Sequence, residues 1–193
     1  MNEPPNSTTT LFTIGHSNHQ ADDFFALLQT YQIQTLVDIR RFPQSKKYPR
    51  FDLEALEESL PRNGITYHWL EALGGWRKGL AEQSPNRGLE ILGYRHYADY
   101  MLTKPFIHAV GQLITIAKLR TSAIMCAEKN PPHCHRIILS DYLVAQGMDV
   151  IHIVDLEKRI KHQLNPLAMI TPEREVLYPK PAVPLQGTLF DVS

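Results

Sequence analysis

The sequence predicts an α/β domain with a mainly parallel β-sheet and helices on both faces, a three-layer, Rossmann-like architecture. Short apolar runs typical of buried strands alternate along the chain with longer segments in which apolar residues recur every three or four positions, as in amphipathic helices. The chain has 193 residues, and 43% of them are hydrophobic, which is enough for one sizeable core. We therefore expect a single folded domain over residues 11–170. A disordered segment at 1–10 precedes it, and an extended, proline-rich tail at 171–193 follows it.

Five segments have the length and apolar content of strands, and helical patterns lie between them. The predicted strands are Leu11–Ile14, Leu36–Ile39, Ile65–Leu70, Ala123–Ala127 and Val150–Val154. The predicted helices are Asp22–Tyr31, Asp52–Leu60, Tyr94–Met101, Phe106–Leu119 and Cys134–Gln146, with Gly147 as the C-cap of the last. The glycine-rich stretch Leu73–Leu92 fits neither pattern, and such a long excursion inside a compact domain is typical of a functional loop or lid.

Charge and composition exclude several classes of protein. Lysine plus arginine equals aspartate plus glutamate at 20 each, so the chain lacks the basic excess that duplex-binding domains usually carry. The polar N-terminus has no basic segment followed by an apolar core, and no apolar run is long enough to cross a membrane. Two cysteines without an export signal are typical of a reducing compartment, where structural disulfides are rare. We expect a soluble cytoplasmic protein.

Polar side chains follow four of the five predicted strands. In a parallel sheet the carboxyl ends of the strands lie along one edge, which is where open α/β proteins bind ligands. We expect these side chains to form one site there. They are His16 and Ser17 after the first strand, Arg40 and Ser45 after the second, Arg77 after the third, and Glu128, Cys134, His135 and Arg136 after the fourth.

This set of residues predicts an enzyme that binds a phosphate- or nucleotide-like anionic ligand. Arg40, Arg77 and Arg136 can hold an oxyanion with their guanidinium groups, together with backbone N–H groups at the N-terminus of the last helix. The further candidates for ligand binding are Ser17, Ser45 and His135.

His16, Glu128 and Cys134 are the candidates for chemistry. A thiol at a helix N-terminus, between two histidines and beside Arg136, should have a lowered pKa, which makes Cys134 a candidate nucleophile. Glu128 could act as a general acid or base, or it could pair with Arg136. Cysteine phosphatases and rhodaneses place five residues between the cysteine and the arginine of a comparable loop, whereas nine separate Cys126 from Arg136, so that motif is absent.

A metalloprotein that uses the loop between residues 126 and 136 is a further alternative. Suitable donors are His16, Cys126, Glu128, His133, Cys134 and His135. Structural zinc sites usually have about two to four residues between paired cysteines, whereas seven separate Cys126 from Cys134. We therefore expect no metal ligands in this set, and we expect Cys126 in the floor of the site as a small core residue.

Several short motifs occur in order along the predicted domain. They are Thr13-Ile14-Gly15-His16-Ser17, Leu36-Val37-Asp38-Ile39-Arg40 with Pro43 and Ser45, Leu73-Gly74-Gly75 with Arg77, Tyr100-Met101, and Cys126-Ala127-Glu128 with Cys134-His135-Arg136. With these motifs the chain resembles, from about Leu11 to Val154, the bacterial and archaeal family called domain of unknown function 488. The resemblance implies an α/β domain and, because the family has no established activity, it names no substrate.

The C-terminal tail suggests an alternative from another class of protein. Gln186, Leu189 and Phe190, in the segment Gln186–Phe190, are similar to the short peptides by which bacterial proteins dock on the replication sliding clamp. A glutamine and a Leu-Phe pair on a flexible tether can fill a polar notch and an apolar pocket. The alternative is a non-catalytic binding module of nucleic-acid metabolism that is recruited through this tail. The same residues could instead fold back on their own domain.

Overall fold

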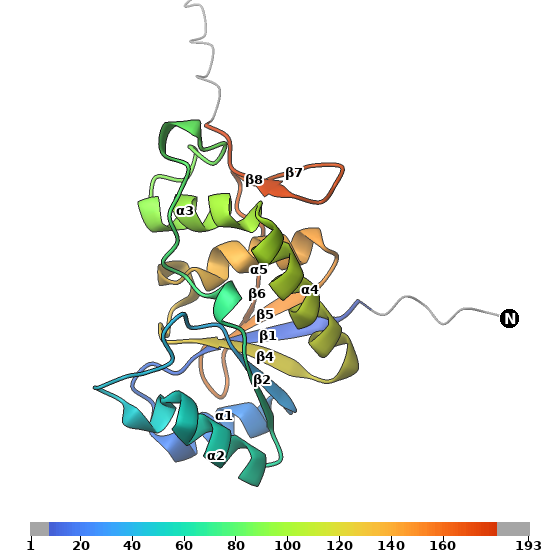
Figure 1. Ribbon diagram of the computed structural model, residues 1–193. Coiled ribbons are helices and arrows are strands. Elements are labelled where there is room, and N and C mark those ends of the chain that lie inside the picture. Colours follow the sequence, from blue (N-terminus) through green and yellow to red (C-terminus); the bar gives the residue numbers. More distant parts are fainter. Residues whose placement is uncertain (1–7, 181–193) are drawn as a thin grey trace, which may run out of the picture.

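A six-stranded sheet forms the centre of the molecule, in the order β3-β2-β4-β1-β5-β6 (Figure 1). The structure is a computed structural model that describes residues 8–180. The strands are β1 (Thr10–Gly15), β2 (Thr35–Asp38), β3 (Thr66–Trp69), β4 (Ser122–Cys126), β5 (Asp149–Ile153) and β6 (Arg159–Lys161). The first five are parallel, and β6 pairs with β5 in the antiparallel sense. The prediction of a mainly parallel sheet is confirmed.

Helices cover both faces of the sheet, as predicted (Figure 1). The helices α1 (Ala21–Thr30) and α2 (Leu53–Arg62) pack on one face through a core that includes Phe24, Leu28 and Leu56. The helices on the other face are α3 (Leu92–Met101), α4 (Lys104–Leu119) and α5 (Arg136–Ala145). Their core includes Tyr97 and Phe106. Because apolar side chains cover β4 on both faces, all five of its residues are buried, which explains its continuous apolar sequence.

Strand register brings the predicted site residues to one edge. Gly15 at the end of β1 lies opposite Cys126 at the end of β4, and Asp38 at the end of β2 lies opposite Met125. The polar segments that follow β1, β2 and β4 therefore leave the sheet at the same edge, side by side. This is the arrangement that the parallel topology predicted.

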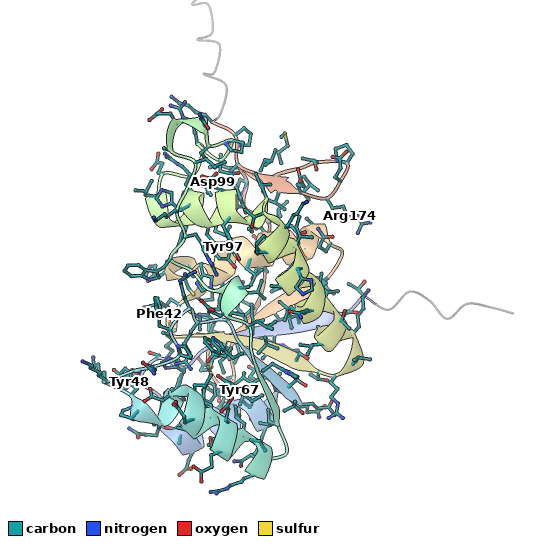
Figure 2. All side chains as sticks on the ribbon, in the orientation of Figure 1. Phe42, Tyr48, Tyr67, Tyr97, Asp99 and Arg174 are labelled. Atoms are coloured by element: carbon teal, nitrogen blue, oxygen red, sulfur yellow. The ribbon has the colours of Figure 1, made fainter. Side chains whose placement is uncertain are left out.

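The glycine-rich excursion follows β3 and contains two short 3-10 turns, Glu71–Leu73 and Ala81–Gln83. Asp99, on α3, is buried beneath it (Figure 2). The carboxylate of Asp99 accepts hydrogen bonds from the backbone N–H of Leu80, the hydroxyl of Ser84 and the amide of Asn86, at 2.6–2.8 Å. The buried carboxylate of Asp99 therefore anchors the middle of the excursion to α3.

The C-terminal part of the described chain corrects one predicted boundary. The segment after residue 170 was expected to be an extended tail, but β7 (Met169–Ile170) pairs with β8 (Val176–Leu177) in a small hairpin. The ring of Tyr178 is fully buried, and its hydroxyl donates to Asp141 on α5 at 2.6 Å. The packed chain thus continues past the predicted boundary at residue 171. At the other end, Thr10 belongs to β1 rather than to the predicted disordered segment.

Two further predictions concern the C-terminal docking segment and membrane-spanning helices. The predicted clamp-docking segment Gln186–Phe190 lies outside the described residues. Among residues 8–180, no helix combines the length and the apolar content that a membrane crossing requires.

Candidate functional site

Two adjoining cavities lie at the carboxyl ends of the parallel strands. The first, of about 350 Å³, is bounded by the segments after β2 and β4, the excursion after β3 and the start of α3. The second, of about 420 Å³, is bounded by the segments after β1, β2 and β4. Arg40, Phe42, Ala127 and Glu128 line both cavities. Phe42 and Tyr48, which line the second, lie at this end of the sheet (Figure 2). The two cavities therefore share a wall and can be occupied by one extended ligand.

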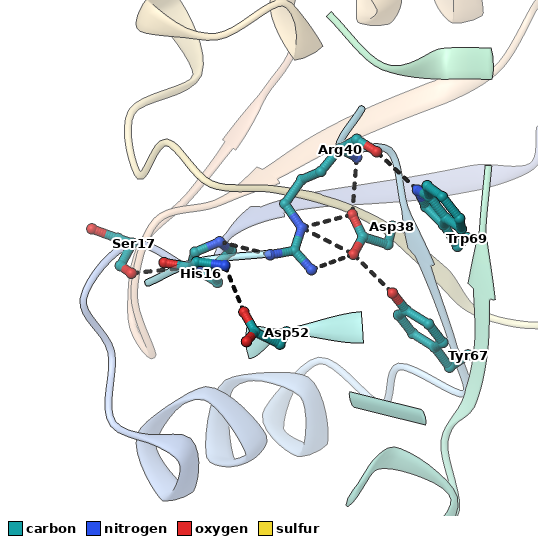
Figure 3. Close-up of polar contacts among 8 residues, drawn as sticks. His16, Ser17, Asp38, Arg40, Asp52, Tyr67 and Trp69 are labelled. Atoms are coloured by element: carbon teal, nitrogen blue, oxygen red, sulfur yellow. Dashed lines mark hydrogen bonds and ion pairs between the residues drawn. The ribbon is translucent and has the colours of Figure 1, made fainter. Parts of the chain in front are cut away.

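Arg40 is the central cation of the site, and the buried carboxylate of Asp38 fixes its position (Figure 3). The Nε of Arg40 lies 2.9 Å from both carboxylate oxygens, and one terminal nitrogen lies 2.5 Å from Oδ2. The hydroxyl of Tyr67, on β3, donates to the same carboxylate at 2.8 Å. Burial alone would lower the pKa of Arg40, but the hydrogen bond and charge of Asp38 raise it above its ordinary value. The guanidinium is therefore permanently charged and held rigidly in the shared wall.

His16 supports Arg40 from the end of β1 (Figure 3). Its Nδ1 lies 3.0 Å from the carbonyl oxygen of Ser17, and its Nε2 lies 3.3 Å from a terminal nitrogen of Arg40. Burial, followed by the charge of Arg40, lowers the pKa of His16 to about 4, so the imidazole is neutral at pH 7. In the tautomer that satisfies both contacts, Nδ1–H donates to the carbonyl and Nε2 accepts from Arg40. Since both nitrogens are engaged, this geometry fits a positioning role better than the predicted catalytic one.

Two sulfur atoms and an imidazole form a compact cluster in the first cavity. Cys126 ends β4, and Cys134 and His135 come just before α5. The donor atoms of all three residues lie within 4.8 Å of one another. A hydrogen bond with Cys126 lowers the pKa of Cys134 well below its ordinary value, and His135 and Arg136 lower it further. The same hydrogen bond, with burial, raises the pKa of Cys126. Cys126 is buried and lines the first cavity, in agreement with the predicted place in the floor of the site, and its sulfur lies close to that of Cys134.

Arg136 and Arg77, which were predicted to hold the ligand, are engaged by the protein itself. Arg136 is fully buried and donates to the sulfur of Cys134 and to the backbone carbonyls of Glu128 and Lys129. It thereby organises the loop after β4 from inside. The backbone N–H groups in the first turn of α5 bond the carbonyls of residues 134 and 135, so they are not directed at an anion.

The side chain of Arg77 donates to three backbone carbonyls of residues 71–74 at 2.8–3.0 Å. Its guanidinium also lies 3.9 Å above the ring of Tyr100. These contacts stabilise the start of the excursion, and the side chain lines neither cavity. The role that the geometry supports for Arg77 is structural.

The remaining predicted residues lie where the sequence placed them, at the edge of the sheet. Ser17 and Ser45 line the second cavity, and His135 lines the first. Glu128 is exposed and lines both. The structure thus brings together seven of the nine predicted residues and leaves Arg77 and Arg136 outside the cavities. The seven are His16, Ser17, Arg40, Ser45, Glu128, Cys134 and His135.

Several lining residues were not among the predicted site residues. They are Arg41, Phe42, Lys47, Trp76 and Tyr94. The sequence does carry a signal for two of them. Phe42 and Trp76 are large aromatic residues in polar loops directly beside predicted site residues, where no core face explains them. Phe42 is 70% exposed and Trp76 is 91% exposed, which confirms that neither is a core residue.

The fold is that of an open α/β protein, with a candidate site at the carboxyl edge of its parallel strands. A family model described as Domain of unknown function DUF488 matches residues 20–143, and the chain belongs to this family. No curated protein and no solved structure matches the chain.

Proposed function

We propose that this protein is an enzyme that binds a nucleotide-like anionic ligand across the two cavities. The observation that carries the proposal is the wall that the two cavities share, which contains the fixed cation Arg40 and the carboxylate of Glu128. Exposed aromatic rings line the cavity on one side of this wall, and small polar side chains line the cavity on the other side. Ligand sites of this size and mixture usually bind small molecules through a few polar groups and apolar surface.

Local charge favours an anion although the whole chain is neutral. Arg40 and Arg41 line the first cavity, and Arg40 and Lys47 line the second. Among residues 8–180, Glu128 is the single acidic residue that lines either cavity. Arg40 already neutralises Asp38, so Arg41 and Lys47 supply the cationic charge that a phosphate could attract. One of these side chains stands in each cavity, so a ligand with two anionic groups or an extended phosphate chain fits the pair.

Exposed aromatic rings beside these cations favour a nucleobase as the rest of the ligand. Phe42 and Trp76 both line the first cavity, and rings of this kind stack on bases with little sequence preference. Trp76 has a φ of 60°, a left-handed conformation that is rare for a bulky residue and costs about 1–3 kcal/mol. Strain of this kind at an exposed tryptophan is typical of a functional site rather than of a surface loop.

Reactive groups in the same cavity favour an enzyme over a passive binding module. Cys134, His135 and Glu128 lie next to the space that the ligand would fill, and a module that only binds has no need of such a set. The alternative, a non-catalytic module recruited through Gln186, Leu189 and Phe190, predicts binding of a longer nucleic acid instead of a mononucleotide.

Ligand-dependent thermal stability tests the proposal. We expect nucleoside mono- and diphosphates to raise the melting temperature, because a ligand that binds only the folded state stabilises it by RT ln(1 + [L]/Kd). Trp76→Ala should weaken binding by roughly ten- to a hundredfold through lost stacking. Arg41→Ala should weaken it by about tenfold through the loss of a hydrogen bond to a charged phosphate. Leu119→Ala and Lys118→Ala serve as controls, since both residues lie at the end of α4, and Leu119 is 77% exposed.

Each alternative outcome has a clear meaning. If no nucleotide shifts the melting temperature, or if Trp76→Ala and Arg41→Ala bind as well as the controls, the proposal is wrong. If single-stranded oligonucleotides bind and mononucleotides do not, the binding-module alternative replaces it.

A further inference from the structure

The compact cluster of Cys126, Cys134 and His135 has the geometry of a metal site. The Nδ1 atom of His135 lies 3.9 Å from the sulfur of Cys126 and 3.7 Å from the sulfur of Cys134. Tetrahedral zinc, with Zn–S bonds of about 2.3 Å and Zn–N bonds of about 2.0 Å, places a sulfur and a nitrogen ligand about 3.6 Å apart. The observed separations exceed this value by a few tenths of an ångström. One ion could therefore contact all three donors after a small movement.

The path of the chain explains why a separation of seven residues does not keep the two cysteines apart. Cys126 is the last residue of β4, and the loop that follows returns to the same point before α5 starts. The buried guanidinium of Arg136 stabilises this loop conformation by donating to the backbone carbonyls of Glu128 and Lys129. The guanidinium also donates to the sulfur of Cys134 at 3.4 Å. Outer contacts of this kind orient metal ligands in known sites.

The imidazole distinguishes a metal site from a simple dithiol. A disulfide between Cys126 and Cys134 would need no third donor, yet Nδ1 of His135 lies nearly equidistant from the two sulfurs. The ring packs against Tyr97, with the centroids 4.9 Å apart. An added Cβ at Gly75 would lie 3.0 Å from the same nitrogen, so the glycine leaves the cavity side of Nδ1 uncrowded.

We infer that Cys126, Cys134 and His135 bind one zinc ion, or a similar thiophilic divalent metal, through three protein ligands. All three residues line the first cavity, so the fourth position faces the space assigned to the nucleotide-like ligand. Three protein ligands with one open position are typical of catalytic rather than structural zinc. Glu128 lines the same cavity but does not belong to the donor cluster, so its carboxylate is available to the cavity without being a ligand.

This inference deepens the proposed function, and its chemical meaning rests on that function, because an open metal position serves catalysis only if a ligand enters the cavity. A divalent metal would there polarise an oxygen of the ligand or activate a water molecule. Metal binding itself is measured without any nucleotide. The two proposals can therefore fail separately: Trp76→Ala should lose nucleotide binding and keep its metal.

The test is metal analysis of the full-length protein, purified under reducing conditions without chelator. We expect about one zinc per chain. After chelation, added Co²⁺ should give the thiolate-to-cobalt charge-transfer band and the strong visible bands of tetrahedral cobalt. Zinc should also protect both thiols against a thiol reagent, and the chain contains only two cysteines, so this count is unambiguous.

Matched variants separate ligands from neighbours. Cys126→Ser, Cys134→Ser and His135→Ala should each lower metal affinity by at least tenfold, with circular dichroism as the check on folding. His133→Ala is the control, because His133 lines the same cavity and lies in the same loop but is not in the donor cluster. Glu128→Gln should keep its metal.

Three results would overturn the inference. The first is that wild-type protein with both thiols reduced binds neither zinc nor cobalt. The second is that a disulfide forms, and no metal binds, when zinc is supplied. The third is that His133→Ala loses as much metal affinity as His135→Ala. Loss of metal in Glu128→Gln would overturn the open position, since the carboxylate would then complete a closed site.

Discussion

Gly15, the last residue of β1, shows how one side chain, or the lack of one, sets the geometry of the site. An added Cβ there would lie 1.9 Å from the carbonyl oxygen of Glu128 and 2.9 Å from the Cα of Lys129. This close approach allows two backbone hydrogen bonds between the segments after β1 and β4. The N–H of His16 donates to the carbonyl of Cys126 at 2.9 Å, and the N–H of Ser17 donates to the carbonyl of Ala127 at 2.8 Å. The absence of a side chain at Gly15 therefore lets the segment after β1, which lines the second cavity, pack directly on the loop after β4.

Gly15→Ala should destabilise the protein by about 2–3 kcal/mol, because a methyl group forced against backbone atoms requires the loop to move. The measurement is the free energy of unfolding from urea denaturation. Gly111→Ala is the matched control, since nothing lies within 4 Å of a Cβ added at this position inside α4. The control should gain about 1 kcal/mol from improved helix propensity. Equal effects of the two substitutions would show that the close approach at Gly15 has no energetic weight.

The three predicted arginines illustrate what sequence can and cannot tell about a site. Their positions after strands were predictable, because parallel topology alone brings such positions to one edge. Their roles were not, because the partner of an arginine depends on where nearby loops direct their carbonyl groups. Arg136 and Arg77 turn inward to backbone carbonyls, whereas Arg40 stays in the cavity wall because Asp38 holds it there. The proximity of Cys126 and Cys134 was not predictable for a related reason, because the number of residues between two cysteines says little about their distance when the loop turns back on itself.

At the scale of elements, the excursion between β3 and α3 carries Trp76 and has little core of its own. Its order depends on Asp99, which is 4% exposed and accepts three hydrogen bonds from residues 80–86. Gly79 permits this arrangement, because an added Cβ would lie 2.2 Å from the ring of His96 and 2.9 Å from a carboxylate oxygen of Asp99. These contacts hold the excursion in one conformation, and its residues Gly75 and Trp76 form part of the wall of the first cavity.

Asp99→Ala should loosen the excursion by removing the acceptor of three hydrogen bonds, with a loss of about 3 kcal/mol in the free energy of unfolding. Hydrogen exchange should accelerate in residues 74–91 and stay unchanged in β1, β2 and β4. Glu82→Ala is the control in the same excursion, because the Glu82 side chain is 91% exposed and its ion pair with Arg87, at 3.4 Å, lies at the surface. Unchanged exchange in Asp99→Ala would mean that the excursion is held by its apolar contacts instead.

Helices and buried strands could be predicted from their periodicity, whereas the short elements could not. The strands β7 and β8 have two residues each, which is too short for any alternating pattern, and β6 has three exposed residues. The proline-rich composition after residue 170 suggested an extended tail. Tyr178 reverses that expectation through long-range hydrogen bonds to Asp141, Asn86 and Gly88, which local composition does not encode.

At the scale of the whole molecule, a buried chain of hydrogen bonds runs from Arg136 at the start of α5, through β1 and β5, to Asp141 further along the same helix. Arg136 donates to the hydroxyl of Thr13 at 3.4 Å, and that hydroxyl lies 2.8 Å from Nδ1 of His152. His152 in turn lies 3.0 Å from His162, which lies 2.8 Å from the carboxylate of Asp141. One set of proton positions satisfies every contact: Thr13 donates to His152, His152 to His162, and His162 to Asp141. This arrangement requires a neutral His152.

His152 should therefore make the protein less stable as the pH falls. Burial, followed by the charges of His162 and Arg136, lowers the pKa of His152 from 6.5 to about 4 in the folded state. Between these values the unfolded chain binds a proton that the folded protein does not, so the free energy of unfolding rises with pH across this window. The contribution is complete above pH 6.5 and is lost progressively toward pH 4, by about 3 kcal/mol in total.

Urea denaturation at several pH values between 4.5 and 7.5 measures this effect, with His152→Gln compared against the wild type. Because carboxylates also titrate near the lower end, the informative quantity is the difference in slope between the two proteins. We expect His152→Gln to reduce the slope by up to about 1.4 kcal/mol per pH unit, since at most one proton is involved. His108→Gln, at an exposed position on α4, should leave the slope unchanged. A wild-type slope in His152→Gln would show that folding does not change the pKa of His152, and the proton positions assigned to the hydrogen-bonded chain would then be wrong.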